Sequence, residues 1–223
     1  MSVVFIDDPA LYHDEFRTTG YVHLKDVLSD DFRTYLTVFQ EHSLRDRENE
    51  IGTSKIHGKK RQFLFDFADR EDAGRFRSGM AALTRIDPER FTISERHLKV
   101  YDEEAPCWPA PHADRAASEI SIGLPVHIPE GSTACMFPEL NFGANIEERP
   151  VFLTERGHPD LEDVYRAQEP VMPNEQFGDV IVFLGSPVFL GQVPAAGAAI
   201  LYITVNGDGR DPLGENIYAS ELA

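Results

Sequence analysis

The sequence has few of the features that mark secreted or membrane proteins. Its 223 residues include only two cysteines, Cys107 and Cys135, which is too few for a disulfide framework. The longest apolar runs, "GDVIVFLG" and "AAILYITV", are much shorter than the roughly 20 residues that a membrane-spanning helix needs. No N-terminal stretch has the pattern of a secretory signal peptide. We therefore expect a cytoplasmic protein that does not cross a membrane and keeps its thiols reduced.

Positive charge is also scarce in this chain. Lysine and arginine number 21 against 38 aspartates and glutamates, and the formal net charge is −17. A polyanion of this kind is repelled by nucleic acid and by anionic lipid, so a small molecule is the expected partner. Hydrophobic residues at 42% and aromatic residues at 10% are enough to build a packed core. The length is that of one domain, which we expect to span residues 1–223.

Hydrophobic patterning predicts a helical layer over about residues 1–90, followed by a β core over about residues 91–206. Ser29 is a candidate N-cap, and apolar residues follow it at helical spacing: Phe32, Tyr35, Leu36 and Phe39. A second helix is expected around Glu71 to Thr84. Short strands are expected at "GYVHLKDVL" and "QFLFDF" within the same layer.

The β core shows the clearest pattern. "FTISERHLKVY" and "STACMFPEL" read as strands, and residues 120–128 alternate strictly between aliphatic and polar or small side chains. Pro125 in that run lacks an N–H donor, so we expect it at an edge or a bulge. Val180–Leu184 and Ala198–Val205 are continuously apolar, which predicts strands buried on both faces. The overall prediction is a mainly β fold with N-terminal helices, an antiparallel sandwich or barrel.

A long excursion separates the two halves of the predicted β core. Residues 142–176 hold several prolines, glycines and acidic residues, with one short helical turn expected near "DLEDVYRA". A loop of this length between the strands of a β core is typical of a segment that lines or covers a pocket. We expect it to carry the determinants of substrate choice.

The strongest chemical signal is the pair His112 and Asp114 in "PAPHADRAASEISIGLPVHI". Residues i and i+2 of a strand project to the same side, and imidazole nitrogen with carboxylate oxygen is a donor set for a divalent metal. His-x-Asp also occurs by chance as a surface pair or an ordinary hydrogen-bonded pair. The context of the motif therefore decides its interpretation.

Three stretches carry that context: "FRTTGYVHLKDVLSDDF", "LKVYDEEAPCWPAPHADRAASEISIGLPVHI" and "FGDVIVFLGSPVFLGQVPAAGAAILYITVN". In this order the chain resembles the phytanoyl-CoA hydroxylase-like branch of the non-heme iron, 2-oxoglutarate-dependent dioxygenases, over most of its length. The resemblance implies a double-stranded β-helix, a cupin-like jelly roll. It also implies Fe(II) held by a His-x-Asp…His triad, with open positions for 2-oxoglutarate and oxygen. His112 and Asp114 match the first two ligands.

The sequence departs from that family at two positions. Leu190 stands before Gly191, where the family has its second histidine, and no histidine follows His158. The stretch Gly197–Ile200 has no basic residue, where the family usually has the arginine that pairs with the far carboxylate of 2-oxoglutarate. A slip of two residues would offer only Gln192, a poor iron ligand. Lys99 or Arg115 are the candidates to replace the missing arginine.

Three interpretations follow from the incomplete motif. In the first, which is the function we expect from the resemblance, the protein is a non-heme Fe(II)/2-oxoglutarate dioxygenase-like enzyme whose metal is held by His112 and Asp114 alone, acting on a small organic molecule. In the second, iron chemistry is lost and the two residues form an acid–base pair for a redox-neutral step such as cyclisation, isomerisation or elimination. In the third, the chain is a non-catalytic partner of an active homologue, or assembles with copies of itself.

Several other residues are weaker candidates. A basic loop holds Lys55, His57, Lys59, Lys60 and Arg61, which is either a solvated loop or a contact for an anionic substrate. His127 lies on the polar side of its predicted strand and is expected at the surface or lining a cavity. Cys135 is expected to be a buried structural thiol. Trp108 and Tyr101 flank the approach to His112 and either wall a pocket or pack the barrel mouth.

Overall fold

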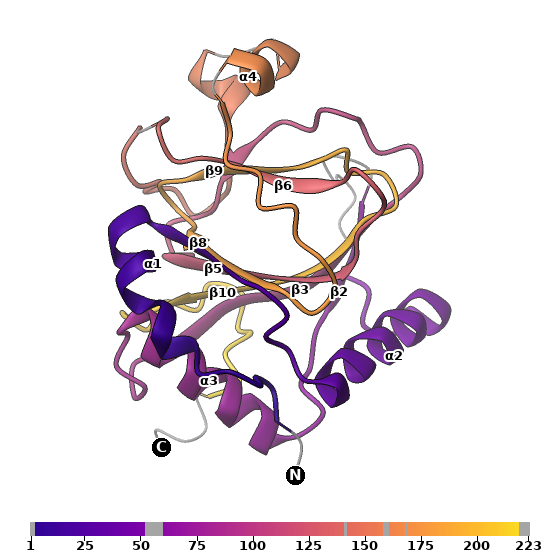
Figure 1. Ribbon diagram of the computed structural model, residues 1–223, viewed down its shortest axis with the longest axis vertical. Helices are drawn as coiled ribbons and strands as arrows, with labels where there is room; N and C mark the ends of the chain where they lie inside the picture. The colour runs from indigo at the N-terminus through magenta and orange to yellow at the C-terminus, as the bar shows by residue number, and fades with distance from the viewer. Residues whose placement is uncertain (1–2, 52–59, 141, 158–160, 168, 219–223) are drawn as a thin grey trace.

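The computed structural model describes residues 3–51, 60–140, 142–157, 161–167 and 169–218. Two antiparallel β-sheets face each other, and three helices cover the outer side of the larger sheet (Figure 1). The larger sheet has six strands in the order β1-β8-β5-β10-β3-β2, and the smaller has four in the order β6-β9-β4-β7. This is the expected antiparallel β architecture with N-terminal helices.

The six-stranded sheet takes strands from both ends of the chain. Its strands are β1 (Tyr21–Leu24), β2 (Lys60–Leu64), β3 (Thr92–Tyr101), β5 (Ile120–His127), β8 (Val180–Leu184) and β10 (Ala199–Asn206). The four-stranded sheet contains β4 (His112–Ala113), β6 (Thr133–Phe137), β7 (Val151–Phe152) and β9 (Phe189–Val193). Two strands of the predicted helical layer, β1 and β2, therefore join the main sheet.

The two longest helices of the described chain, α2 (Asp30–Asp46) and α3 (Arg70–Thr84), begin at side-chain caps. The described chain also has α1 (His13–Thr19) and α4 (Leu161–Ala167). Ser29 caps α2 by accepting a hydrogen bond from the backbone N–H of Phe32, as expected. Asp69 caps α3 in the same way through the N–H of Asp72. Both caps satisfy amide groups that have no partner inside the helix.

Most strands agree with the alternation in the sequence, with three exceptions. The short strands β4 and β7 and the buried strand β9 were not predicted. Pro125 lies in an interior strand, but the pairing of β5 with β10 shifts register at Ile200, next to Pro125. This register shift is the predicted bulge, which is thus confirmed. On the other side, β8 pairs with β5 only as far as Gly123, so Pro125 has no strand partner there.

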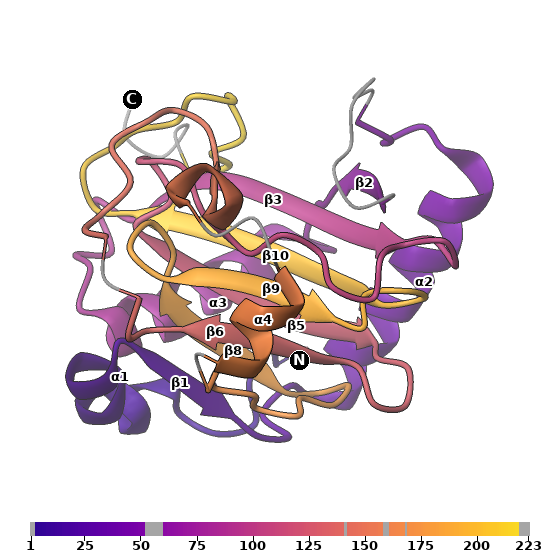
Figure 2. The ribbon, with the colours of Figure 1, turned by 90° about the horizontal axis from the view of Figure 1, so that it is seen from above.

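The main core lies between the six-stranded sheet and the helices. Phe32, Phe63, Phe65 and Phe76 are almost fully buried there, and they join the aliphatic residues of β5, β8 and β10. A second cluster lies under α4, where Val164 and Tyr165 pack on the outer side of the four-stranded sheet (Figure 2). Because the helices seal one face of the large sheet, its other face is left to line the space between the sheets.

No helix in the described part of the chain is long and apolar enough to cross a membrane. The expectation of a single domain over residues 1–223 stays a prediction.

Candidate functional site

A pocket of about 960 Å³ opens between the two sheets. Its volume is at the upper end of the range for small-molecule sites. One wall comes from β2 and β3, the opposite wall from β4 and β9, and the rim from Arg149–Glu155 of the long excursion. The excursion thus lies where it was expected, beside the pocket. A much smaller cavity of about 10 Å³ continues inward from the same residues.

His112 and Asp114 both line this pocket. The Nε2 atom of His112 lies 3.6 Å from Oδ1 of Asp114, and the two side chains are 16% and 18% exposed. The imidazole ring packs against the ring of Phe152, its neighbour on β7, with centroids 5.5 Å apart. The sequence prediction that these two side chains project to the same side is therefore confirmed.

A glycine leaves room for the Asp114 carboxylate. Ser121 Oγ donates a hydrogen bond of 2.5 Å to Asp114 Oδ2, and the Asp114 backbone N–H donates to the carbonyl of Gly185. A Cβ atom on Gly185 would lie 2.3 Å from Ser121 Oγ and 3.2 Å from Asp114 Oδ2. Position 185 therefore needs glycine for the carboxylate to hold this place. Burial raises the pKa of Asp114, while Lys99 acts in the opposite direction.

Leu190 stands where the resemblance predicts the third ligand. It is the register partner of His112 across β4 and β9, and it lines the small cavity beneath the pair. Gln192, two residues on, pairs with Ala134, and its amide nitrogen donates to Ser132 and to Glu175. No group of three or more His, Cys, Asp or Glu side chains able to share a metal ion occurs among the described residues.

The donor atoms of His112 and Asp114 are close enough to bind one iron ion together. Two atoms that each lie about 2.1 Å from one cation can be up to about 4.2 Å apart, so the 3.6 Å between His112 and Asp114 allows both to touch one ion. The facing side chain, Leu190, is a hydrocarbon and supplies no third donor. The set therefore does not fit the complete facial triad that the resemblance implies.

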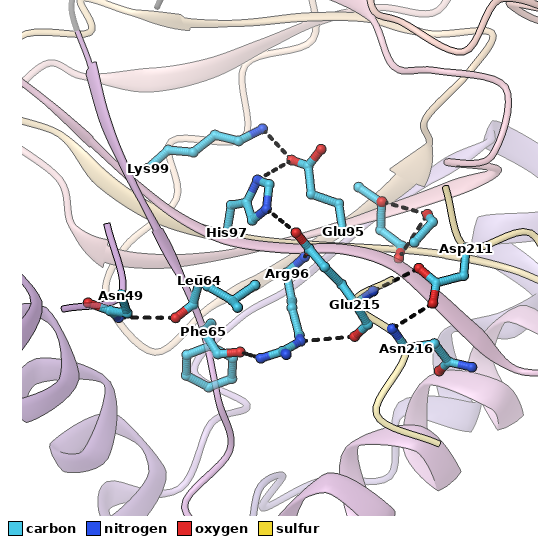
Figure 3. A network of polar contacts seen from close by, with 12 residues as sticks. Asn49, Leu64, Phe65, Glu95, Arg96, His97, Lys99, Asp211, Glu215 and Asn216 are labelled. Carbon is cyan, nitrogen blue, oxygen red and sulfur yellow. Dashed lines mark hydrogen bonds and ion pairs between the residues drawn. The ribbon is translucent and has the colours of Figure 1, made fainter. Parts of the chain in front are cut away.

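A buried charge network forms the floor of the pocket (Figure 3). Glu95, His97 and Lys99 alternate along β3 with their side chains on the pocket side. Glu95 is the centre of the network: its carboxylate lies 2.9 Å from Lys99 Nζ and 3.0 Å from Arg115 Nη2. Burial alone would raise the pKa of Glu95, but Lys99, His97 and Arg115 outweigh it and hold that pKa well below its usual range.

The C-terminal segment completes the network. Glu215 lies 2.8 Å from His97 Nε2 and accepts from the backbone N–H of Arg96, while Asp211 receives the N–H of Glu215 (Figure 3). His97 Nδ1 lies 3.3 Å from Glu95, so both ring nitrogens face carboxylates. Burial would lower the pKa of His97, but the two carboxylates outweigh it and raise that pKa. The arrangement suits an imidazolium, in which both nitrogens donate.

Lys99 and Arg115 were the candidates to hold the far carboxylate of 2-oxoglutarate. Both line the pocket, and Lys99 is the register partner of Ile200, near the position of the missing arginine. Each already has Glu95 as its partner. A role in binding 2-oxoglutarate stays a prediction for both.

The remaining candidates fall into three groups. Trp108 and Tyr101 line the pocket, which favours the pocket-wall interpretation. His127 is exposed at the end of β5, and Cys135 is buried, where desolvation raises the pKa of its thiol to about 12. In the basic loop, Lys55, His57 and Lys59 lie outside the described residues. Lys60 and Arg61 belong to β2, and Lys60 lines the pocket.

Sequence reasoning missed Glu95, His97 and Glu215. A usable signal was present in "SERHLKVY", where charged residues alternate with Leu98 and Val100 at the period of a strand. Such alternation inside a sheet indicates a polar face lined by partners. No comparable pattern surrounds Glu215, which reaches the pocket only through the fold of the C-terminal segment.

The sequence matches no protein-family model and no curated protein. Solved structures of α-ketoglutarate-dependent enzymes share the fold of this chain, a double-stranded β-helix. The carbocyclase SnoK from nogalamycin biosynthesis, a non-heme, α-ketoglutarate-dependent enzyme, superposes with a TM-score of 0.60 at 16% identity, covering 98% of this chain and 92% of SnoK.

Two further structures show the same likeness. The epimerase SnoN, solved with Fe³⁺, α-ketoglutarate and nogalamycin RO, gives a TM-score of 0.59 at 13% identity, covering 92% of this chain and 87% of SnoN. A Pseudomonas putida prolyl-4-hydroxylase gives 0.54 at 19% identity, covering 91% of this chain and 99% of the hydroxylase. The expected double-stranded β-helix is confirmed. The narrower resemblance to phytanoyl-CoA hydroxylases stays a prediction.

Proposed function

We propose that this protein is an enzyme that carries out a redox-neutral step on a small organic molecule bound between its two sheets. His112 and Asp114 act as its acid–base pair. The observation that carries the proposal is the leucine at position 190, directly across the strand pair from His112. It leaves the histidine and the carboxylate side by side in a large pocket, and no third His, Cys, Asp or Glu ligand joins them in the part of the chain that the structure describes.

The chemistry follows from the surroundings of the pair. Histidine exchanges protons near neutral pH, and a carboxylate whose pKa is raised by burial is a better proton acceptor than a solvated one. Ser121 holds Asp114 in place by donating to Oδ2, which leaves Oδ1 facing His112 and the pocket. One residue of the pair takes a proton from the substrate and the other returns one at a second position. Isomerisation, cyclisation and elimination all need these two transfers.

The structural neighbours show that this scaffold serves several kinds of reaction. SnoN is an α-ketoglutarate-dependent epimerase and SnoK an α-ketoglutarate-dependent carbocyclase, so related folds that use this cosubstrate rearrange small organic molecules, and another neighbour is a prolyl hydroxylase. The fold alone does not determine which reaction this chain carries out.

A second candidate is an iron- and 2-oxoglutarate-dependent oxygenase with only two protein ligands. The 3.6 Å separation of His112 and Asp114 favours it, since one cation could contact both residues. Association with a second copy or with a homologous subunit stays a prediction under either candidate.

One experiment separates the two candidates. Protein stripped with a chelator is incubated under argon with a small-metabolite extract, and consumed and formed species are followed by mass spectrometry. We expect isomeric products, or products that differ by loss of water, to form without iron or oxygen. Conversion that requires added ferrous iron, oxygen and 2-oxoglutarate, with release of succinate, would instead establish the second candidate.

Variants assign the conversion to the pair. His112→Gln and Asp114→Asn keep side-chain size and should each lower the rate by about 100-fold or more, the range for a lost acid–base group. Glu71→Gln, which alters an ion pair with Arg75 on α3 outside the pocket, is the matched control and should leave the rate unchanged. Full activity of both pair variants would contradict the proposal.

A further inference from the structure

Lys60 is a half-buried lysine that the acid–base pair does not use. It is the first residue of β2 and the register partner of Tyr101, while Gln62 pairs with Lys99. Lys60 and Lys99 are therefore diagonal neighbours on one face of the sheet, close enough for long side chains to interact. Both line the pocket, and both also line the small cavity that His112 and Asp114 share.

The two lysines differ in their partners. Lys99 Nζ lies 2.9 Å from Glu95, so this cation has a carboxylate as its ion-pair partner in the network at the floor of the pocket. No carboxylate of the described residues lies within ion-pair distance of Lys60, whose Nζ lies 5.4 Å from the centroid of the Tyr101 ring. A cation without a counter-ion in such a place is costly, because it has lost water and gained only a weak ring contact.

The surroundings favour the neutral amine of Lys60. Burial, and then the positive charge of Lys99, lower the pKa of Lys60 to about 7, although Glu95 and Asp114 act in the opposite direction. Near neutral pH the Lys60 amine is then neutral, with a free lone pair, in roughly half of the protein molecules. For an ordinary lysine the neutral fraction is about one part in a thousand or less. A lysine that is desolvated and next to a second cation is a recognised form of activated nucleophile.

We propose that Lys60 is a nucleophilic lysine that forms an imine with an aldehyde or ketone substrate bound in this pocket. The inference rests on the proposed function, since it names the substrate class for the same site. The lysine nitrogen forms a bond to the carbonyl carbon and gives up one proton while the carbonyl oxygen takes one up, which yields a carbinolamine. A second proton then goes to that oxygen, the C–O bond breaks with loss of water, and the nitrogen lone pair forms the C=N bond of a protonated imine.

The neighbouring residues have defined parts in this step. His112, in the same cavity as Lys60, is placed to protonate the departing oxygen in its imidazolium form. Lys99 stays bound to Glu95 and acts only as a fixed charge. The resulting imine withdraws electrons from the adjacent carbon, which makes that C–H bond easier to break by a base. This serves the isomerisation, cyclisation and elimination reactions proposed above and needs no oxidant or reductant.

The first test measures the pH at which the amine becomes reactive. The folded protein is labelled with trace acetic anhydride from pH 6 to pH 10, and each lysine is followed by peptide mass spectrometry. Labelling of Lys60 should rise with a midpoint near 7, and the exposed Lys25 is followed in the same samples as the control. In Lys99→Met the Lys60 midpoint should move upward. A Lys60 midpoint equal to that of Lys25 would overturn the inference.

The second test traps the imine. The protein is incubated with pyruvate, acetoacetate or butyraldehyde and sodium cyanoborohydride, which reduces imines to stable amines. We expect the added mass on Lys60 at least tenfold faster than on Lys25. Lys60→Arg keeps a cation but cannot form an imine, so it should lose this adduct, whereas Lys25→Arg should retain it. Trapping on Lys60 no faster than on Lys25 with all three probes would refute the role.

The two proposals fail in different ways. Trapping is scored without turnover, so an adduct on Lys60 in protein that converts no metabolite would overturn the proposed function and leave the reactive lysine standing. Metal-free conversion at an unchanged rate in Lys60→Arg would overturn the imine and leave the His112 and Asp114 pair as the catalyst.

Discussion

Replacing Glu95 by glutamine tests how much the buried network contributes to stability. Glutamine keeps the volume of the side chain, so the change removes charge without opening a cavity. Three cationic groups then lose their shared carboxylate: Lys99 at 2.9 Å, Arg115 at 3.0 Å and His97 at 3.3 Å. The side chains of Lys99 and Arg115 are 11% and 15% exposed, so water replaces the lost charge poorly.

The expected loss follows from the cost of an unpaired buried charge. Removing one partner of a buried ion pair destabilises a protein by about 3–5 kcal/mol. We expect about 3 kcal/mol for Glu95→Gln, because the glutamine oxygen can still accept one of the three donors. For a chain of this size the corresponding fall in Tm is about 6–12 °C. Glu147→Gln, in an exposed pair with Arg149, should cost at most about 1 kcal/mol.

Urea unfolding of both variants measures these values. The midpoint should fall for Glu95→Gln with an unchanged slope, and adding Lys99→Met should recover part of the loss, since one unpaired cation is removed. The pKa of Glu95 is lowered in the folded state, so its contribution is present above about pH 4.3 and is lost as pH falls through the folded value. A Glu95→Gln midpoint equal to that of Glu147→Gln at pH 7 would refute the reasoning.

Three further predictions follow from the site. Leu190→His should raise affinity for ferrous iron at least about tenfold, measured by metal titration against the wild type, because it adds the missing donor opposite His112; equal affinity would show that the strand pair does not present a third ligand. Gly185→Ala should lower stability by about 1–3 kcal/mol in urea unfolding, since its Cβ would lie 2.3 Å from Ser121 Oγ; an unchanged midpoint would mean that the serine can move. Because the pKa of His97 is raised in the folded protein, its stabilising effect is complete below about pH 6.5 and is lost as pH rises through the folded value. The difference in free energy of unfolding between the wild type and His97→Gln should therefore shrink at alkaline pH. A difference that stays constant up to pH 9 would contradict an imidazolium at neutral pH.

The strands with regular alternation could be predicted from the sequence, and the short ones could not. Residues 120–128 alternate because the aliphatic side chains of β5 pack in the main core, while its other face carries small or polar residues such as Ser121 and Gly123. Val180–Leu184 is apolar throughout because apolar side chains bury both of its faces. β4 and β7 have only two residues each, which is too short for any periodicity. β9 was overlooked because glycine and glutamine interrupt "FLGQV".

Some residues of the candidate site could also be predicted from the sequence, and others could not. The pair His112 and Asp114 was predicted because two chemically informative residues at strand spacing are visible in one short segment. Leu190 was predicted to stand in the ligand position, and the register of β4 with β9 places it opposite His112. The network around Glu95 joins residues that are far apart in the chain, such as Arg115 and Glu215, so no local sequence pattern predicts it.

The sequence by itself determined the kind of fold, the location of the His112 and Asp114 pair and the presence of leucine at position 190, where the resemblance predicts a third ligand. These are properties of local periodicity and of residue identity at one position. Only the tertiary structure decided that Lys60 shares a cavity with that pair and that Glu95 neutralises Lys99 but not Lys60. The physical reason is that charge and pKa depend on which groups come within a few ångströms after folding, and the pairing of β2 with β3 sets those distances.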